Sequence, residues 1–121
     1  MFFKTRSRFT RNKRGRSGSK NGQGEMGLRF EWDRKKAAIN FRKHGVSFDE
    51  ASTVFNDPLA RIFDDEDHSE EEAREIIIGH SATGRLLIVH FNERQSNVIR
   101  TISARLATPR ERDDYEKNQN R

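Results

Sequence analysis

The side chains with the most suggestive chemistry in this sequence are arginines and histidines at the ends of predicted strands and helices. Arg105 is the clearest case, because it ends a run rich in β-branched residues that begins at Val98 and a helix start follows it. A guanidinium held there by a sheet faces solvent, where its planar group can form two parallel hydrogen bonds to an anion. Arg105 is therefore our first candidate for a functional residue.

Further candidates occupy similar positions at helix ends or in predicted strands. They are Lys43, His44, Arg74, His80 and His90. Each also has a purely structural interpretation: Lys43 and His44 complement the negative end of a helix dipole, and Arg74 can pair with a glutamate of a nearby acidic loop. Taken singly, these residues favour the structural interpretation, whereas for Arg105 the two interpretations are evenly balanced.

The sequence lacks the motifs that mark most catalytic and cofactor-binding sites. It has no Ser-His-Asp motif, no metal-binding histidine pair, no glycine-rich phosphate loop and no cysteine. Residues 64–72 include seven carboxylates, so a metal site built on Asp65, Asp67 and His68 has to be weighed. Such a run is more often a solvated loop, here with a capping box that begins at Ser69. We predict no metal site and no cofactor.

The composition indicates a single domain. At 121 residues, of which 31% are hydrophobic and 36% are charged, the chain has room for one modest core. No apolar run approaches the roughly 18 residues that suggest a membrane span. The basic start of the chain is not followed by the apolar core of a signal peptide. We therefore expect a cytoplasmic protein that makes no contact with a membrane.

Positive charge is concentrated in residues 1–27. This segment carries eight Lys or Arg and one Glu, hence +7, and since the whole chain carries +5 the remainder carries −2. Because the segment has no apolar periodicity, we expect it to be disordered and dispensable for folding. It is either a basic arm that adds affinity for phosphates or, as we favour, an extension upstream of a natural start at Met26. The predicted domain spans residues 28–117, and residues 118–121 form a disordered tail.

Helices in the first half and strands in the second half must position the candidate side chains. Residues 28–32 alternate apolar and polar side chains, as in a half-buried strand, and Asp33 and Ser47 each begin a helix. Predicted strands then cover residues 59–63, 75–79, 86–91 and 98–105. Thr108 caps the start of the last helix, with Pro109 at its first position and Glu111 completing a capping box. The predicted fold class is α+β in the order β-α-α-β-β-β-β-α, with an antiparallel sheet packed by helices.

The register of the central hairpin decides which candidates share a face. Strands 75–79 and 86–91 are joined by residues 81–84, a connection of hairpin length. If that loop is symmetric, the numbers of paired residues sum to 165, which places Glu75 opposite His90. Arg74 then lies on the other face, opposite Phe91. A one-residue bulge would reverse this arrangement.

The sequence resembles the BrnT toxins of bacterial type II toxin–antitoxin systems. The residues that carry the resemblance are, in order, Phe30-Glu31-Trp32-Asp33, Lys36, Lys43-His44-Gly45-Val46-Ser47-Phe48, Glu50-Ala51, His68-Ser69, Glu72, Arg74, Ile78-Gly79, Ile102-Ser103-Ala104-Arg105, Ala107-Thr108, Glu111-Arg112 and Tyr115. The resemblance covers residues 28 to about 117 and leaves the basic arm outside. One departure is conservative: Thr101 stands where the family usually has an aliphatic residue.

The resemblance implies a RelE-like α+β fold and ribonuclease activity that needs no metal or other cofactor. It also implies a cognate antitoxin with a DNA-binding domain as partner, so that DNA is contacted only through the antitoxin. In such a ribonuclease the 2′-hydroxyl of the RNA attacks the adjacent phosphorus. The protein must then orient the chain, assist proton transfer and stabilise the charge on the phosphoryl oxygens.

The candidates can be assigned to these tasks. Arg105 and Arg74 suit charge stabilisation, and His44 suits proton transfer, with His90 as its substitute. The predicted RNA-binding residues are Lys43, Arg94 and His90. The alternative is an inactive interaction module that binds the antitoxin and takes part in repressing their shared promoter. We favour the ribonuclease because Arg74 and Arg105 are both present.

Overall fold

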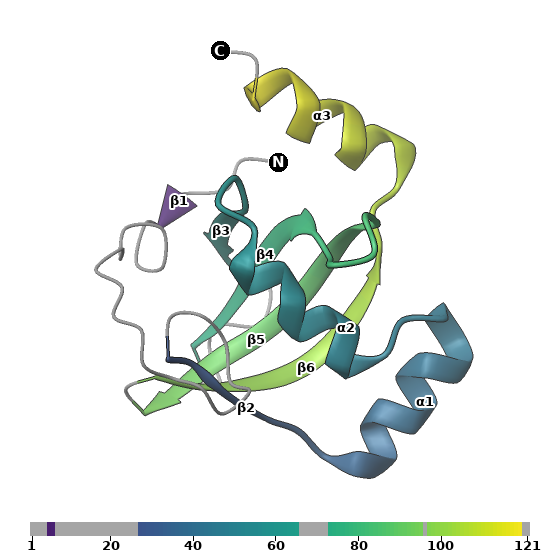
Figure 1. The fold of residues 1–121 in the computed structure, drawn as a ribbon, viewed down its shortest axis with the longest axis vertical. Coiled ribbons are helices and arrows are strands. Elements are labelled where there is room, and N and C mark those ends of the chain that lie inside the picture. Colours follow the sequence, from purple (N-terminus) through teal and green to yellow (C-terminus); the bar gives the residue numbers. More distant parts are fainter. Residues whose placement is uncertain (1–4, 7–26, 66–72, 96, 120–121) are drawn as a thin grey trace.

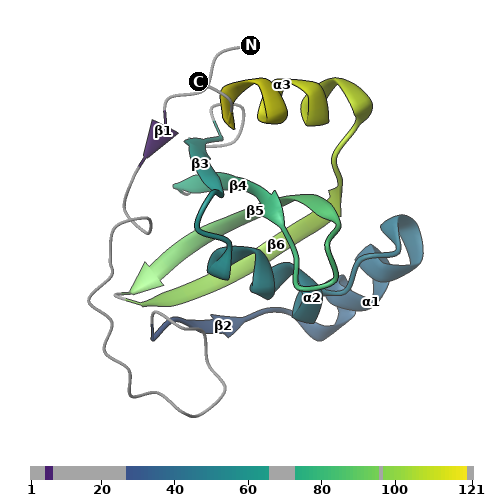
Figure 2. The same cartoon turned by 45° about the horizontal axis from the view of Figure 1, so that its top comes forward.

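One sheet with helices on both faces forms the described part of the chain (Figures 1 and 2). This computed structural model describes residues 5–6, 27–65, 73–95 and 97–119. The strands lie in the order β1-β3-β4-β5-β6-β2. They are β1 (Thr5–Arg6), β2 (Arg29–Glu31), β3 (Arg61–Asp64), β4 (Arg74–His80), β5 (Leu86–Gln95) and β6 (Val98–Leu106). The helices are α1 (Arg34–His44), α2 (Phe48–Thr53), the short 3-10 helix η1 (Val54–Asn56) and α3 (Pro109–Gln119).

The predicted α+β class and the order of the main elements are confirmed, but the sheet is mixed rather than antiparallel. β2 pairs in parallel with β6, with Phe30 opposite Ile99. The two strands are joined by most of the chain rather than by a hairpin, and only such a long connection permits parallel pairing. The last helix also continues to Gln119, two residues beyond the predicted end of the domain.

Two residues of the predicted disordered arm belong to the sheet. Thr5 and Arg6 form β1, which pairs antiparallel with Phe63 and Ile62 of β3. The outer edge of β3 would otherwise present unpaired backbone groups, and an extended segment of any sequence can satisfy them. Residues 1–4 and 7–26 lie outside the described residues, as does the capping box predicted at Ser69.

The helix starts follow the predicted capping residues. The Asp33 carboxylate accepts hydrogen bonds from the backbone N–H groups of Lys35 and Lys36 at 2.9 and 3.1 Å, which begins α1. Gly45 ends this helix in the left-handed conformation, with φ of 72°. At α3, Glu111 N–H donates to Thr108 Oγ1 at 3.1 Å while Thr108 N–H donates to Glu111 Oε1 at 2.9 Å. This reciprocal pair is the predicted capping box.

The predicted register of the β4–β5 hairpin is wrong by one residue. Glu75 lies opposite Phe91, and His90 lies opposite Ile76. The connection contains three residues rather than four, because Ser81 N–H donates to Arg85 O at 2.9 Å and closes the loop around residues 82–84. Gly84 has φ of 87° and supplies the left-handed position that such a loop requires. The shift turns every side chain of β4 to the opposite face relative to β5.

The two faces of the sheet carry different clusters. On one face, α1, α2 and η1 pack over the main core, in which Phe55 contacts Phe30 and Phe91 with ring centroids 5.3 and 5.0 Å apart. α3 lies on the opposite face of the sheet, which we call the α3-side face (Figure 2). Tyr115 of α3 packs there with a smaller cluster that includes Ile78 and Ile88.

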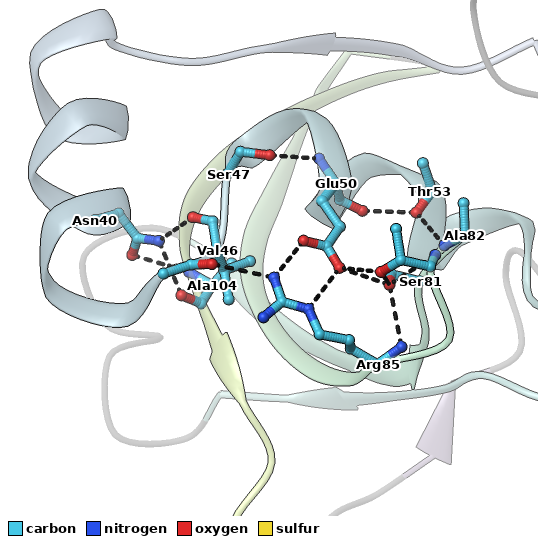
Figure 3. Close-up of polar contacts among 11 residues, drawn as sticks. Asn40, Val46, Ser47, Glu50, Thr53, Ser81, Ala82, Arg85 and Ala104 are labelled. Atoms are coloured by element: carbon cyan, nitrogen blue, oxygen red, sulfur yellow. Dashed lines mark hydrogen bonds and ion pairs between the residues drawn. The ribbon is translucent and has the colours of Figure 1, made fainter.

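A side-chain amide holds α1 against the edge of β6 beyond the end of β2. The buried Asn40 donates from Nδ2 to the carbonyls of Ala104 at 2.9 Å and Val46 at 3.0 Å. Its Oδ1 accepts from the Ala104 N–H at 3.1 Å, so the amide pairs with β6 as a strand backbone would (Figure 3). One side chain therefore joins the helix, the loop that follows it and the sheet.

Asn40→Ala should destabilise the fold by about 3 kcal/mol. The change leaves the Ala104 N–H without a partner in a buried position and removes a donor from two carbonyls, and each buried group left in that state costs about 1–3 kcal/mol. Urea unfolding followed by circular dichroism measures the difference. Ile39→Ala is the control. The Ile39 side chain, next to Asn40 in the sequence, is 58% exposed, so its loss should change the free energy of unfolding little. A loss below about 1 kcal/mol for Asn40→Ala would show that water replaces the amide.

Candidate active site

Polar side chains from three neighbouring strands gather on the α3-side face. Three cross-strand rows follow from the observed registers: Arg74, Asn92 and Arg100; then Ile76, His90 and Ser103; then Ile78, Ile88 and Arg105. Directly opposed residues in such rows lie about 5 Å apart, and successive rows on one face lie about 7 Å apart. The sheet thus places Arg74, His90 and Arg105 on one surface, whereas the predicted register had separated Arg74 from His90.

A bulge in β6 sets which residues of that strand face this surface. Ser103 pairs with His90, but Thr101 pairs with Phe91, so Ile102 is an extra residue in the ladder. Without the bulge, strict alternation would turn Arg100 and Arg105 to opposite faces. With it, both arginines lie on the α3-side face.

His90 lies between a hydroxyl and a buried carboxylate. Its Nδ1 is 3.2 Å from Ser103 Oγ, and its Nε2 is 3.9 Å from Asp65 Oδ2. The His90 side chain is 23% exposed and that of Asp65 is 6% exposed, so the ring reaches the surface while the carboxylate stays inside. Sequence reasoning considered Asp65 only as a metal ligand and did not single out Ser103. Neither partner is visible from spacing, because the bulge and the end of β3 bring them to His90.

Arg105 is held by the first turn of α3. Its Nη1 and Nη2 donate to the two carboxylate oxygens of Glu111 at 2.8 and 3.0 Å, and Nη1 also donates to Leu106 O at 3.2 Å. The hydrogen bonds from Arg105 lower the pKa of Glu111 to about 2, and the same pair raises the pKa of Arg105. The guanidinium is therefore charged and oriented, and one of its edges is already occupied.

A second arginine pair lies at the other end of the same strands. Arg100 Nη1 is 3.3 Å and Arg94 Nε is 3.9 Å from Glu31 Oε2 of β2. These side chains are more than one-third exposed. Arg94 was a predicted RNA contact, whereas Arg100 was not. Arg100 lies in the predicted strand 98–105, and the alternation of side chains along that strand could have marked it as a surface residue. The α3-side face thus carries basic side chains near both ends.

Lys43 and His44 do not join this cluster. They end α1, which lies with α2 on the opposite side of the sheet from α3 (Figure 2). Lys43 is exposed and His44 is half-buried there. The placement does not support His44 as the acid or base that works with Arg105. His90, its predicted substitute, is the histidine that shares a face with Arg74 and Arg105.

Comparison with known proteins identifies the family of this chain. The family model for the ribonuclease toxin BrnT of type II toxin–antitoxin systems matches residues 32–111. The chain belongs to the BrnT family. The crystal structure of the ribonuclease toxin BrnT of Brucella abortus is similar to the chain, with 24% sequence identity and a TM-score of 0.53 over 67% of this chain and 97% of that chain. A search of curated proteins gave no match.

The family assignment confirms the resemblance to the BrnT toxins, and the matched part of the chain includes the polar cluster of the α3-side face. The part of the chain that matches the BrnT family contains Arg74, His90, Arg105 and Glu111, while the basic arm lies outside it. The fold of the Brucella structure supports the α+β architecture described above. Membership in a type II toxin–antitoxin family also implies an antitoxin partner.

The described residues contain neither a cluster of metal-binding side chains nor a helix that could span a membrane. Within residues 5–6, 27–65, 73–95 and 97–119, no three His, Asp or Glu side chains lie close enough together to hold a metal ion. Asp67 and His68 of the weighed metal site lie outside these ranges. The helices found there are too short and too polar to cross a membrane.

A separate polar network stabilises the other side of this BrnT fold. Glu50 of α2 accepts hydrogen bonds from Ser81 at 2.7 Å, Thr83 at 2.8 Å and Arg85 Nε at 3.0 Å, and Arg85 Nη2 also pairs with it (Figure 3). Arg85 Nη2 further donates to Gly45 O at 3.0 Å. The hydrogen bonds from Arg85, followed by those from the hydroxyls, lower the pKa of Glu50 to about 2. The network therefore ties the β4–β5 hairpin to both helices.

Glu50→Gln should reduce the dependence of stability on pH in acid. The Glu50 pKa falls from 4.5 to about 2 on folding, so its carboxylate contributes stability that is present above pH 4.5 and is lost as the pH falls toward 2. The wild-type protein should thus be more stable than Glu50→Gln near neutral pH, and the difference should shrink between these values. Urea unfolding across that pH range measures it. Glu116→Gln, at a side chain that is 60% exposed, is the control, and equal pH profiles for the wild type and Glu50→Gln would contradict the assignment.

Proposed function

We propose that this chain is a metal-independent endoribonuclease toxin that cleaves RNA and so inhibits translation and growth. Its active site is the α3-side face. The observation that carries the proposal is that Arg74, His90 and Arg105 share this face across three adjacent strands. Their side chains are those that RNA cleavage by the 2′-hydroxyl requires, namely cations for the phosphate and a group for proton transfer.

The arginines bind and stabilise the phosphate. Negative charge grows on the phosphoryl oxygens as the 2′-oxygen attacks phosphorus, and a guanidinium gives charge-assisted hydrogen bonds to two of those oxygens. Arg74 enters the face from β4 and Arg105 enters it from β6. Arg100 of β6 and Arg94 of β5 extend the positive charge toward the end of the strands away from Arg105, where they hold the RNA chain to one side of the cleaved bond.

His90 transfers the proton. An imidazole with an ordinary pKa of about 6.5 exchanges protons near neutral pH, and the Asp65 carboxylate beside Nε2 favours a proton on that nitrogen. Nδ1 then takes the proton of the 2′-hydroxyl, after RNA displaces or shares the contact with Ser103. As the 2′-oxygen bonds to phosphorus, the bond from phosphorus to the 5′-oxygen breaks, which leaves a 2′,3′-cyclic phosphate, and the departing 5′-oxygen takes a proton from the imidazolium or from water. Asp65 and Ser103 orient the ring and do not touch the phosphorus.

The partner is a cognate antitoxin with a DNA-binding domain, so that DNA is contacted only through it, and the site of action is the cytoplasm. Support comes from the type II toxin–antitoxin family and from the mixed charges of the surface. One observation favours the alternative of an inactive module that binds the antitoxin and takes part in repression. Glu111 occupies one edge of Arg105, and RNA must compete with that carboxylate.

RNA cleavage should persist in excess EDTA, and Arg105→Ala should lower its rate by about 10²–10³. A donor to the developing oxyanion is lost, whereas Arg105→Lys should restore part of the rate because a point charge lacks the bidentate geometry. Cleavage of single-stranded RNA, with circular dichroism to verify folding, measures the effect. Glu111→Gln is the matched control, since it breaks the same ion pair and leaves the guanidinium.

The possible contrary results separate the alternatives. Equal rates for the wild type and Arg105→Ala would remove Arg105 from the mechanism. Loss of wild-type cleavage in EDTA would instead indicate a metal site at the acidic residues 64–72. A wild-type protein that cleaves nothing but binds the antitoxin would favour the inactive interaction module.

His90→Ala should lower the cleavage rate by about 10²–10⁴, the usual contribution of a general acid or base. It should also remove one titrating limb from the pH–rate profile of the wild type, because a general acid or base contributes such a limb. His44→Ala is the matched control, because it removes a histidine from the opposite side of the sheet and should leave both rate and profile unchanged. The reverse pattern, with His44→Ala inactive and His90→Ala active, would restore the assignment made from sequence.

A further inference from the structure

α1 touches the rest of the protein along a narrow stripe. Asn40 is buried and Ala37 and His44 are half-buried, as expected for residues three or four positions apart on one side of a helix. Every other residue of the helix is exposed. The helix is therefore attached by one side and open to solvent over most of its circumference.

The open side of α1 is basic, and three of its five cations lie where they do not stabilise the helix itself. Its cations are Arg34, Lys35, Lys36, Arg42 and Lys43. The first turn contains no acidic residue, so the three cations there lie at the positive end of the helix dipole. Asp33, the nearest carboxylate in the sequence, is used as the helix cap. Such a local conflict between sequence and structure is typical of a surface selected for another purpose.

Apolar side chains accompany these cations. Ile39 is 58% exposed and Phe41 is 55% exposed, among the most exposed large apolar side chains of the described residues. Ile39 lies four positions from both Lys35 and Lys43, so all three share one side of the helix. We call Lys35, Ile39, Arg42 and Lys43 the α1 outer surface. It combines an apolar centre with a positively charged rim.

We propose that the α1 outer surface is the docking site for an acidic amphipathic segment of the antitoxin. The identity of the partner rests on the proposed function, and the chemistry of the segment follows from the surface. Its carboxylates pair with the rim and relieve the repulsion at the first turn, and its apolar side chains cover Ile39. An RNA chain fits less well, because phosphates gain nothing from an aliphatic side chain, and the arginines suited to RNA lie across the sheet.

The antitoxin segment can be recognised from its sequence. The reading frame adjacent to the toxin gene should encode a segment with apolar residues at helical spacing flanked by Asp or Glu. Docking on α1 leaves the α3-side face to be covered by another part of the antitoxin or left open. Binding at α1 is therefore separable from inhibition of cleavage.

The test is the affinity of the toxin for the protein encoded by the adjacent reading frame. Ile39→Glu and Lys35→Glu should each raise Kd at least about tenfold, because each repels the acidic segment and the first also removes the apolar contact. Both changes suit the helix, since the first places a carboxylate four residues from two lysines and the second places one at the positive end of the dipole. Thermal unfolding should accordingly show no loss of stability.

Leu59→Glu is the matched control for Ile39→Glu, because Leu59 is also 58% exposed and lies outside α1. It should leave Kd within about twofold. If the wild type and both α1 variants bind the antitoxin equally, the docking site is wrong and the proposed function stands. If the wild type does not bind the adjacent product at all, both the antitoxin proposal and this site fail. Reduced affinity for single-stranded RNA with unchanged antitoxin binding would assign the surface to RNA and overturn the proposal.

Discussion

The hydrogen bonding of β6 along both of its edges is the constraint on which the rest of the structure depends. One edge pairs with β5, and this ladder places the residues of the proposed site. The other edge pairs first with β2 and then, where β2 has ended, with the side chain of Asn40. An amide can replace a strand there because it offers a donor and an acceptor in one plane. α1 thus joins the edge of the sheet without adding a strand.

Local sequence signals predicted the parts of the fold that depend on neighbouring residues. Asp33, Ser47 and Thr108 begin helices because each cap is completed within three residues of the chain. The strands followed from alternation and from apolar runs in the same way. Arg105 was chosen as a candidate because strand end and helix start are adjacent in sequence. Its carboxylate partner, Glu111, was seen only as a capping residue, although the same geometry lets it accept from both the backbone and the guanidinium.

The parts that could not be predicted depend on single-residue choices in pairing. The three-residue loop closed by Ser81 and Arg85 changed the face of Arg74 relative to His90, and no local preference separates it clearly from a four-residue loop. The bulge at Ile102 brought Arg100 and Arg105 to one face, and none of the sequence signals used to predict the strand marks the extra residue. The exclusion of His44 from the arginine face follows from the side of the sheet on which α1 packs.

The parallel pairing of β2 with β6 has a consequence for the synthesis of the protein. β2 precedes α1, whereas its partner strand follows β5 and is translated much later, so Phe30 must wait for Ile99 before it can pair. Such distant pairing slows folding, because the chain loses the entropy of closing a long loop before any contact forms to offset that loss. The arginines proposed to bind RNA on β6 also emerge late from the ribosome. A nascent toxin therefore completes its sheet and its proposed cleavage site together, once β6 has left the ribosome.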